Sequence, residues 1–402
     1  MKKGLIRAVV MLLLAAFMLL TVACGGANSN ADNGTSSQTE TLLLPPGNDE
    51  QSPSTNDWGD ASGIKNVILV IGDGMGLEHI TAGEMYEGKN YAFTDWQKVS
   101  VNTDSVETNG KGAVLTDSAA AGTALATGCL TVNGYVGKDY AGRNVRTILD
   151  GAKENGKATG IVTTDALHGA TPAAFSAHSL SRTDADGIVM SQLTSGVDLL
   201  CGSTHSVCTN RKNSIVSAGY AYCDDFSAID GTLSAERVYW QLNMGGVDAP
   251  VTLADATEKA LAFLERDEDG FVLMIEQAHV DKYSHSNDFR GVAESVRSLN
   301  DTVEAILEWL GDRTDTAILV TADHETGGLS VSYTSRLSQS FWAENVKIYY
   351  SFSSVEHTNH KVGLFVYGVK VDFSNYSYSS RHVLKNIDVY SIMQDVLNNA
   401  LS

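Results

Sequence analysis

The chain has 402 residues, a formal net charge of −20 and 43 % hydrophobic residues. This balance is typical of a folded protein and excludes a chain that is disordered throughout. The acidic charge argues against a nucleic-acid-binding surface, which needs clustered Lys and Arg. A phosphorylated substrate stays compatible with the charge, provided that metal cations supply positive charge locally.

Residues 1–23 have the features of a signal peptide. A basic start, with "MKK" and Arg7, precedes the apolar run "AVVMLLLAAFMLLTVA", which is short for a membrane-spanning helix. Cys24 follows directly, where a bacterial lipoprotein carries its lipid. We therefore expect export and anchoring at the cell surface or in the periplasm through lipid on Cys24. An ordinary signal peptide followed by an incidental cysteine is the alternative.

Residues 24–62 predict a lipid-bearing cysteine followed by a disordered tether, because they are rich in Gly, Asn, Ser, Thr and acidic residues. Residues 63–402 contain no second break of this kind and predict one folded domain. An exported domain can form disulfides. Cys201 and Cys208 are close in sequence, and we expect them to pair; the competing bridge joins one of them to Cys223.

Five apolar runs predict strands that are buried on both faces. They begin at Asn66, Ala158, Phe271, Thr316 and Val362. Helical patterns, such as residues 291–312, lie between them. This alternation of strands and helices predicts an α/β fold with a largely parallel sheet.

Polar side chains come at or just after the ends of three of these runs. They are Asp73, Glu276 and the pair Asp323–His324. Ligands of open α/β sheets bind outside the carboxyl ends of the strands, so these side chains are expected to converge at one edge. The glycines around Asp73 permit a close approach to a ligand, although a plain tight turn would use them equally well.

Two further segments offer metal ligands. Asp281 and His285, in "EQAHVDKYSH", are four residues apart, so one helical turn would place them on the same face. Asp and His together suit zinc, although an exposed polar turn is the simpler interpretation of this segment alone. His357 precedes the last apolar run, and a lone histidine is more often structural than a ligand.

A candidate nucleophile lies in "AVLTDSAAAGTALATG", residues 113–128. Here Asp117 and Ser118 stand between a strand-like run and an Ala-rich, helix-like run. From this segment alone, Ser118 is expected to cap the helix, and a part in chemistry is the alternative, because the start of a helix also directs backbone N–H groups at a bound anion.

The order of these motifs resembles that of the alkaline phosphatases over residues 63–400. The matching stretches are "NVILVIGDGMG", "TDSAAAGTALATG", "GATPAAFSAHSLSR", "EQAHVDKYSH", "TADHETGG" and "EHT". The resemblance implies an alkaline-phosphatase-like α/β fold for residues 63–402, with a large, mostly parallel central sheet sandwiched between helices. It also implies metal-dependent hydrolysis of phosphate monoesters through a phosphoserine intermediate, with release of inorganic phosphate.

The resemblance further implies two Zn²⁺ ions and one Mg²⁺ ion. The implied ligands are Asp281, His285 and His357 for the first zinc; Asp73, Asp323, His324 and Ser118 for the second; and Thr171, Glu276 and a shared oxygen of Asp73 for the magnesium. The implied catalytic residues are Ser118 as nucleophile, Arg182 as phosphate clamp, Asp117 as the residue that orients the clamp, and Lys282 as a cation near the phosphate.

The chain departs from the family pattern at Gly169. The family usually has Asp or His directly before "ATPA", so a weakly occupied magnesium site is expected here, or His168 is displaced into the role. His178 and His279 match no ligand position, and we expect both to be structural.

Several alternatives stay open. A phosphodiesterase or another phosphoryl transferase of the same superfamily is the first, although Arg182 argues against it because the clamp needs two free phosphoryl oxygens. A sulfatase is disfavoured, since Ser118 is not part of a C/S-x-P-x-R stretch. A non-catalytic surface binding lipoprotein is the alternative from a different class. Members of the family are often dimers, so a homodimer is compatible with the resemblance.

Overall fold

The computed structural model describes residues 59, 61–344, 346–376, 382–399 and 401. The chain divides into two units, residues 1–48 and 49–402, and the first lies wholly outside the described residues. The predicted signal peptide, the lipid on Cys24 and the part of the predicted tether before residue 59 also fall outside the described residues. Within the described part of the chain, no helix combines the length and the hydropathy that crossing a membrane requires.

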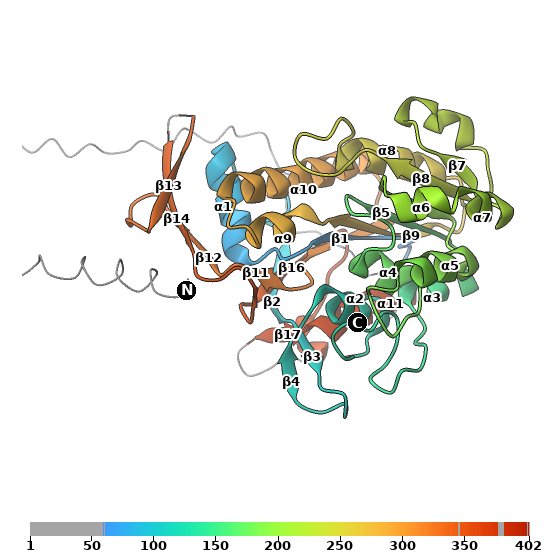
Figure 1. Cartoon of the computed structure of the whole chain (residues 1–402), viewed down its shortest axis with the longest axis horizontal. Coiled ribbons are helices and arrows are strands. Elements are labelled where there is room, and N and C mark those ends of the chain that lie inside the picture. The colour runs from blue at the N-terminus through green and yellow to red at the C-terminus, as the bar shows by residue number, and fades with distance from the viewer. Residues whose placement is uncertain (1–58, 60, 345, 377–381, 400, 402) are drawn as a thin grey trace, which may run out of the picture. The chain divides into compact units, whose positions relative to one another are not determined.

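The centre of the described unit is a ten-stranded sheet (Figure 1). From β10 to β7 in the sheet, each pair of neighbouring strands is parallel, whereas β16 runs antiparallel to both β10 and β2. This confirms the expected large, mostly parallel α/β sheet. In spatial order the strands are β17 (Val383–Lys385), β2 (Gln97–Asn102), β16 (Val362–Tyr367), β10 (Thr316–Thr321), β1 (Asn66–Gly72), β9 (Phe271–Gln277), β5 (Ala158–Thr163), β6 (Leu199–Ser203), β8 (Val238–Leu242) and β7 (Ala221–Cys223).

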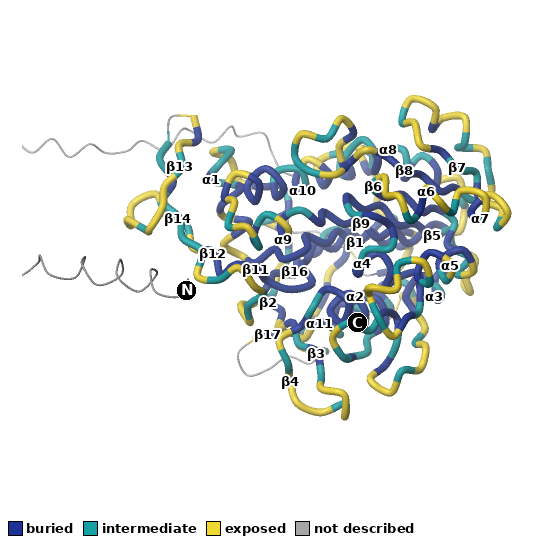
Figure 2. Tube along the Cα trace, viewed as in Figure 1, coloured by how far each residue is buried: buried dark blue, intermediate teal, exposed yellow. Residues whose placement is uncertain are grey.

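Helices cover both faces of the sheet, as the resemblance implied. In Figure 1, α8 and α10 lie above the sheet and α3, α4 and α11 below it, with α2 packed on α4 and α11. Figure 2 shows the strands and the inner sides of these helices buried together. Their bounds are α2 (Ser118–Thr127), α3 (Ile148–Glu154), α4 (Ala170–Ser176), α8 (Leu253–Leu264), α10 (Phe289–Leu310) and α11 (Asn386–Leu397).

The local sequence accounts for these elements. Every residue of β1, β9 and β10 is buried, which is why these strands are mostly apolar and carry polar residues only at their ends. In α10, apolar residues recur with helical spacing and face the sheet. Asp288 caps this helix by accepting a hydrogen bond from the Gly291 amide at 3.2 Å, so the helix begins two residues before the predicted start.

The remaining elements lie around this core. The helices are α1 (Leu77–Glu87), α5 (Ala185–Ser195), α6 (Ser206–Asn210), α7 (Lys212–Ser217) and α9 (His279–Ser284), with 3₁₀ segments η1 (Phe226–Thr232) and η2 (Phe373–Asn375). The smaller sheets pair β3 (Asp104–Val106) with β4 (Ala113–Leu115), β11 (Glu325–Thr326) with β15 (His357–Thr358), and β14 (Val346–Phe352) with both β12 (Leu329–Ser332) and β13 (Gln339–Ala343).

The register of four adjacent strands positions the functional residues. Ile71 of β1 is the register partner of Thr321 in β10 and of Glu276 in β9. Glu276 is in turn the partner of Thr163 in β5. The carboxyl ends of β10, β1, β9 and β5 therefore lie level with one another, and the residues that follow them share one edge of the sheet.

The expected disulfides are absent. Cys129, Cys201, Cys208 and Cys223 are all free thiols, so both proposed pairings of Cys201 and Cys208 are wrong in this structure. Cys201 is fully buried within β6, whereas the thiol of Cys208, in α6, packs near the Tyr239 hydroxyl. The thiol of Cys223 donates to the Asp225 carbonyl oxygen at 3.2 Å. Proximity in sequence did not bring the sulfur atoms together.

Alkylation should therefore label Cys201, Cys208 and Cys223 completely when the protein is unfolded without a reducing agent. In the folded protein the three thiols should react slowly because they are buried, whereas the partly exposed Cys129 serves as the reactive control. Peptide mass spectrometry measures both, and a disulfide-linked peptide containing Cys201 or Cys208 would contradict the structure.

Candidate functional site

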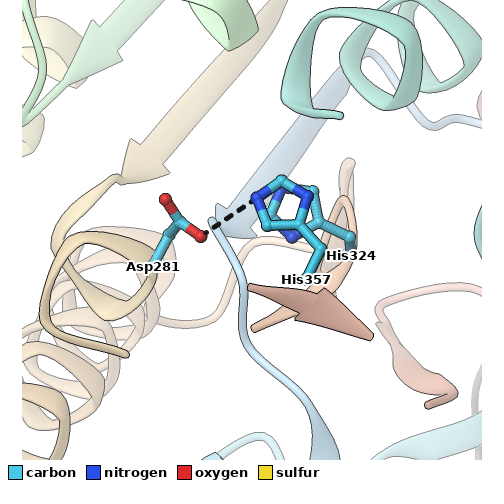
Figure 3. Close-up of side chains that lie close together, drawn as sticks. All are labelled: Asp281, His324 and His357. Atoms are coloured by element: carbon cyan, nitrogen blue, oxygen red, sulfur yellow. Dashed lines mark ion pairs between the residues drawn. The ribbon is translucent and has the colours of Figure 1, made fainter. Parts of the chain in front are cut away.

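Two overlapping groups of metal-ligating side chains lie at the shared edge of the sheet. Asp73, Asp323 and His324 each offer a ligand atom within 4.8 Å of the others. Asp281, His324 and His357 do the same (Figure 3). His324 belongs to both groups, so the two sets form one continuous cluster. Its members come from four separate segments of the chain, as expected for residues that follow neighbouring parallel strands.

The distances within the cluster are short. His324 Nε2 lies 3.4 Å from Asp73 Oδ1 and 3.4 Å from Asp323 Oδ2. Asp281 Oδ1 lies 3.6 Å from His357 Nε2 and 3.3 Å from His285 Nε2. Asp281 is in α9 and His285 is the residue that ends it, so the predicted placement of this pair on one helical face is confirmed.

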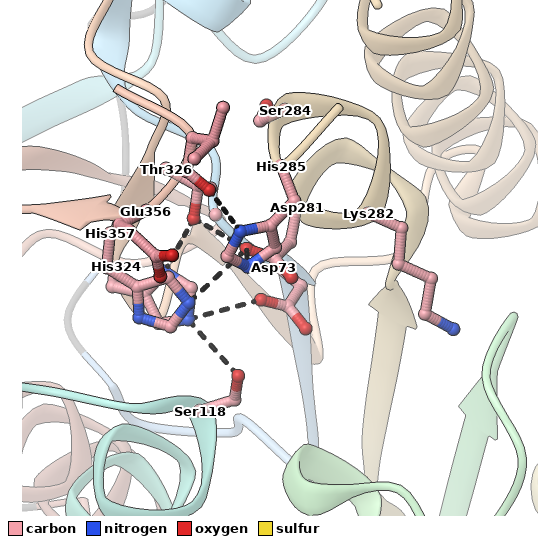
Figure 4. Close-up of polar contacts among 12 residues, drawn as sticks. Asp73, Ser118, Asp281, Lys282, Ser284, His285, His324, Thr326, Glu356 and His357 are labelled. Carbon is pink, nitrogen blue, oxygen red and sulfur yellow. Dashed lines mark hydrogen bonds and ion pairs between the residues drawn. The ribbon is translucent and has the colours of Figure 1, made fainter. Parts of the chain in front are cut away.

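The imidazole rings of His285, His357 and His324 are each held by a contact at Nδ1. His285 donates to the Val355 carbonyl oxygen at 2.5 Å, and His357 donates to the Thr116 carbonyl oxygen at 2.9 Å. In both rings this leaves Nε2 directed at the cluster (Figure 4). Metal-binding histidines are oriented in this way, with one ring nitrogen held by a carbonyl or hydroxyl group and the other free for the metal.

Thr326 is a site residue that the sequence analysis missed. Its hydroxyl donates to Asp281 Oδ1 and lies 3.2 Å from His324 Nδ1, from which it accepts a hydrogen bond. One side chain thus orients a carboxylate and an imidazole of the cluster. No sequence signal marked this role, because Asp281 is 45 positions away and the hydroxyl meets it only in the folded chain.

Two carboxylates of the cluster, those of Asp73 and Asp323, lie where burial disfavours their charged form. Burial, followed by the charge of Asp323, raises the pKa of Asp73 well above its usual value. Burial likewise raises the pKa of Asp323. Asp73 Oδ1 and Asp323 Oδ2 are buried and find no hydrogen-bond partner within the described part of the chain. Burial lowers the pKa of His324 to about 3, so this imidazole supplies no compensating charge.

These observations fit bound divalent cations. Buried carboxylates need a positive partner, and unprotonated imidazole nitrogen with carboxylate oxygen is a donor set that zinc accepts. The histidines of the cluster come with the ring orientation that ligation requires. The residues present therefore suit the metals that the sequence predicted.

Ser118 lies against this cluster at the start of α2. Its Oγ is 3.2 Å from His324 Nε2 (Figure 4), and the residue is almost fully buried. The N-cap of α2 is Asp117, whose Oδ1 accepts from the Ala120 amide at 2.9 Å. The expectation that Ser118 caps the helix is therefore wrong: Asp117 carries out the capping, which leaves the serine hydroxyl to face the cluster.

Asp117 also fixes Arg182. Its second oxygen, Oδ2, accepts from Arg182 Nη1 at 3.2 Å and from the Gly134 amide at 3.0 Å. This places the guanidinium beside the N-terminus of α2, on the side of Ser118. Because Arg182 is partly exposed, its remaining N–H groups are available to an anion bound there.

Glu276 and Thr171 form a second, adjacent part of the site. Both are buried, and the hydroxyl of Thr171 has no hydrogen-bond partner. Glu276 accepts a hydrogen bond from Thr163. Burial, followed by the charge of Asp165, raises the pKa of Glu276 to about 7. Lys282 points away from the histidines (Figure 4) and donates to Asp165 Oδ1 at 2.6 Å. Asp165 was not among the predicted site residues.

The other histidines lie outside the two metal-ligating groups. The ring of His168 packs on that of His205, with 4.5 Å between their centroids. His178 donates from Nδ1 to the Gly137 carbonyl oxygen at 2.6 Å. His279 Nδ1 lies 3.1 Å from the Thr164 hydroxyl.

Comparison with known proteins identifies the family. The sequence profile of the family described as alkaline phosphatase matches residues 64–212 and 234–390, which include every residue of the cluster. The chain belongs to the alkaline phosphatase family. This confirms the family that the motif order predicted.

Curated relatives and solved structures agree with this alkaline phosphatase assignment. Alkaline phosphatase 4 of Bacillus subtilis (strain 168) is 32 % identical over 294 residues, or 68 % of this chain and 64 % of the relative. Alkaline phosphatase 3 of that strain is 31 % identical over 303 residues, or 70 % and 65 %. The chain thus spans slightly less than two thirds of the length of these relatives.

Among solved structures, a histidine-to-glutamate mutant of TAB5 alkaline phosphatase with Mg bound in its M3 site superposes with a TM-score of 0.71 at 25 % identity. The superposition covers 85 % of this chain and 99 % of that one. The fold of this chain is therefore that of the alkaline phosphatases.

Replacing Thr326 by valine should lower zinc affinity roughly 10- to 100-fold, as is usual when a residue that orients metal ligands is lost. Valine keeps the shape but cannot bond to Asp281 or His324. Zinc retained against a graded chelator measures the effect, with Thr326→Ser as the control that keeps the hydroxyl. Equal zinc retention by the valine variant and the unaltered protein would show that the hydroxyl does not support the metal site.

Proposed function

We propose that this chain hydrolyses phosphate monoesters with bound divalent metal ions, through transient phosphorylation of Ser118, and releases inorganic phosphate. The observation that carries the proposal is the position of the Ser118 hydroxyl. It lies 3.2 Å from His324 Nε2, within a buried cluster of carboxylates and imidazoles. Membership of the alkaline phosphatase family supports a phosphoryl hydrolase, while the metal requirement and the serine intermediate rest on this geometry.

The proposed metals are two Zn²⁺ ions and one Mg²⁺ ion. The contacts of Asp281 with His285 and His357 support the first zinc set, and the grouping of Asp73, Asp323 and His324, with Ser118 beside it, supports the second. The proposed magnesium ligands are Thr171, Glu276 and a shared oxygen of Asp73; oxygen donors suit Mg²⁺, and a related structure holds Mg in its M3 site. When bound, such cations neutralise buried carboxylates, lower the pKa of coordinated hydroxyl groups and stabilise developing charge.

The residues of the chain have distinct parts in the reaction. Arg182, held by Asp117, binds two non-bridging oxygens of the phosphoryl group with its planar fork. The free N–H groups at the start of α2 face the same group. The Ser118 oxygen attacks phosphorus, and the bond to the leaving oxygen breaks. Water then cleaves the phosphoserine, which regenerates Ser118 and releases phosphate.

A phosphodiesterase is the second candidate within the same superfamily. A diester has one fewer free oxygen for Arg182 to hold, so the clamp favours monoesters. A surface protein that binds metal without turnover is the candidate outside the enzymes. Hydrolysis of an aryl monoester and an aryl diester, with metal content measured on the same sample, separates the three.

The substrates that we propose are small phosphate monoesters that reach the enzyme outside the cytoplasm. Export and the lipid on Cys24 rest on the sequence of residues 1–24 alone. A homodimer likewise stays a prediction from the resemblance.

Acid quenching during turnover should trap phosphate on Ser118, because hydrolysis of the phosphoserine needs a deprotonated water that acid removes. Ser118→Ala should abolish trapping and lower kcat/KM by about 100-fold or more, with residual turnover from positioning and charge stabilisation. Ser295→Ala is the matched control, since this buried helix serine bonds, among the described residues, only to the Gly291 carbonyl oxygen of its own helix. Full activity in Ser118→Ala, or phosphate on another peptide, would refute the mechanism.

Arg182→Ala should weaken inorganic phosphate inhibition and reduce monoester turnover by roughly 10- to 100-fold, in line with the loss of a charge-assisted bidentate contact. Diester turnover should fall much less, because the diester offers fewer oxygens to the fork. Steady-state kinetics on both esters measures the ratio, and Arg182→Lys tests whether charge without the fork is sufficient. A parallel loss on both esters would contradict the assignment of Arg182 as the monoester clamp.

A further inference from the structure

Asp165 lies beside the proposed magnesium site without belonging to any predicted ligand set. It follows β5 by two residues, and β5 is the neighbour of β9, which carries Glu276. The hydroxyl of Thr163 accepts from the Asp165 amide at 2.9 Å and donates to Glu276. One threonine therefore ties the two acidic residues together at the edge of the sheet.

The carboxylate of Asp165 fills the space that a side chain at position 169 would occupy. A Cβ on Gly169 would lie 2.5 Å from Asp165 Oδ2 and 3.1 Å from its Cγ. Gly169 is the N-cap of α4, with Asp165 four positions before it in the sequence. The turn between β5 and α4 thus brings a carboxylate back to the position where the chain has no side chain.

Thr171 gives an independent sign that a ligand belongs here. It lies in the first turn of α4 with only 1 % of its surface exposed, and its hydroxyl has no hydrogen-bond partner among the described residues that meets the usual distance and angle. The carboxylate of Glu276 lies nearby. A buried hydroxyl without such a partner is unfavourable unless a bound group meets it.

Lys282 fixes one end of the Asp165 carboxylate. Its ammonium group donates to Oδ1 at 2.6 Å, whereas Oδ2 is the oxygen that lies next to Gly169. The ion pair thereby leaves Oδ2 directed at Gly169, the residue at the start of α4. Lys282 is thus a positioning residue for Asp165.

We propose that Asp165 supplies, from a different sequence position, the anionic oxygen that Gly169 cannot supply to the third metal site. The inference rests on the proposed function, since it names a residue of that same site. With Asp165, Glu276 and Thr171, the side chains around the site offer only oxygen donors, which favour Mg²⁺ over zinc. The site is then filled by Mg²⁺, in contrast to the weak occupancy that Gly169 alone predicts.

The experiment measures Mg²⁺ binding directly, by metal analysis after dialysis and by the Mg²⁺ dependence of the melting temperature. The unaltered protein should hold one Mg²⁺ per chain. Asp165→Asn should raise the Mg²⁺ midpoint by about 10-fold or more while zinc content stays unchanged. The double variant Asp165→Ala/Gly169→Asp should bring the midpoint back to near the original value, because it returns a carboxylate to the same space.

Two controls make the result specific. Asp198→Asn removes a carboxylate that also pairs with a lysine, Lys153 at 2.9 Å, but at the opposite edge of the sheet, so it should leave the Mg²⁺ midpoint unchanged. Gly169→Asp alone places two carboxylates in one space and should not improve Mg²⁺ binding.

An unchanged Mg²⁺ midpoint in Asp165→Asn would overturn the proposal, as would a double variant that melts normally but binds no Mg²⁺. Absence of Mg²⁺ from the third metal site of the unaltered protein would do the same. Failure of the proposed function would give a different result: the protein would bind Mg²⁺ through Asp165 but would neither hydrolyse a monoester nor form a phosphoserine.

Discussion

The repulsion among buried carboxylates is the constraint on which the rest of the site depends. Asp73 and Asp323 are held together by the register of β1 and β10, with oxygens that no hydrogen bond satisfies. When two parallel strands end level with each other, the residues just beyond their ends lie side by side. The main-chain hydrogen bonds that align the strands also align these residues. The arrangement is costly for an empty site and favourable for one that holds divalent cations.

A second layer of contacts keeps this cluster in order. Main-chain carbonyl groups hold the rings of His285 and His357, and Thr326 holds both His324 and Asp281. These partners are not among the grouped ligand atoms, yet they decide which ring nitrogen faces the cluster. Asp117 acts in a similar way for the substrate, because its two oxygens cap α2 and orient Arg182. Capping by Asp117 is what leaves the Ser118 hydroxyl directed at the cluster.

Asp165 illustrates how a fold can keep a chemical group while its sequence position changes. The family pattern places an acidic residue or a histidine directly before "ATPA", and this chain has Gly169 there. The turn that joins β5 to α4 instead returns the Asp165 carboxylate to that space, where Lys282 holds it. A site of this kind depends on where an oxygen lies and not on which residue carries it.

The sequence by itself determined the fold class and most of the cluster. The mostly apolar runs that became β1, β9 and β10 predicted buried strands, and a polar residue at or just after the end of each run marked one edge of the sheet. The spacing of Asp281 and His285 sufficed to place them on one face of a helix. Tertiary structure alone decided the free state of Cys201 and Cys208, the cap on α2, and the contacts of Thr326 and Asp165. The physical reason is that these features depend on side chains meeting across distant or tightly turned segments, which neither periodicity nor motif spacing records.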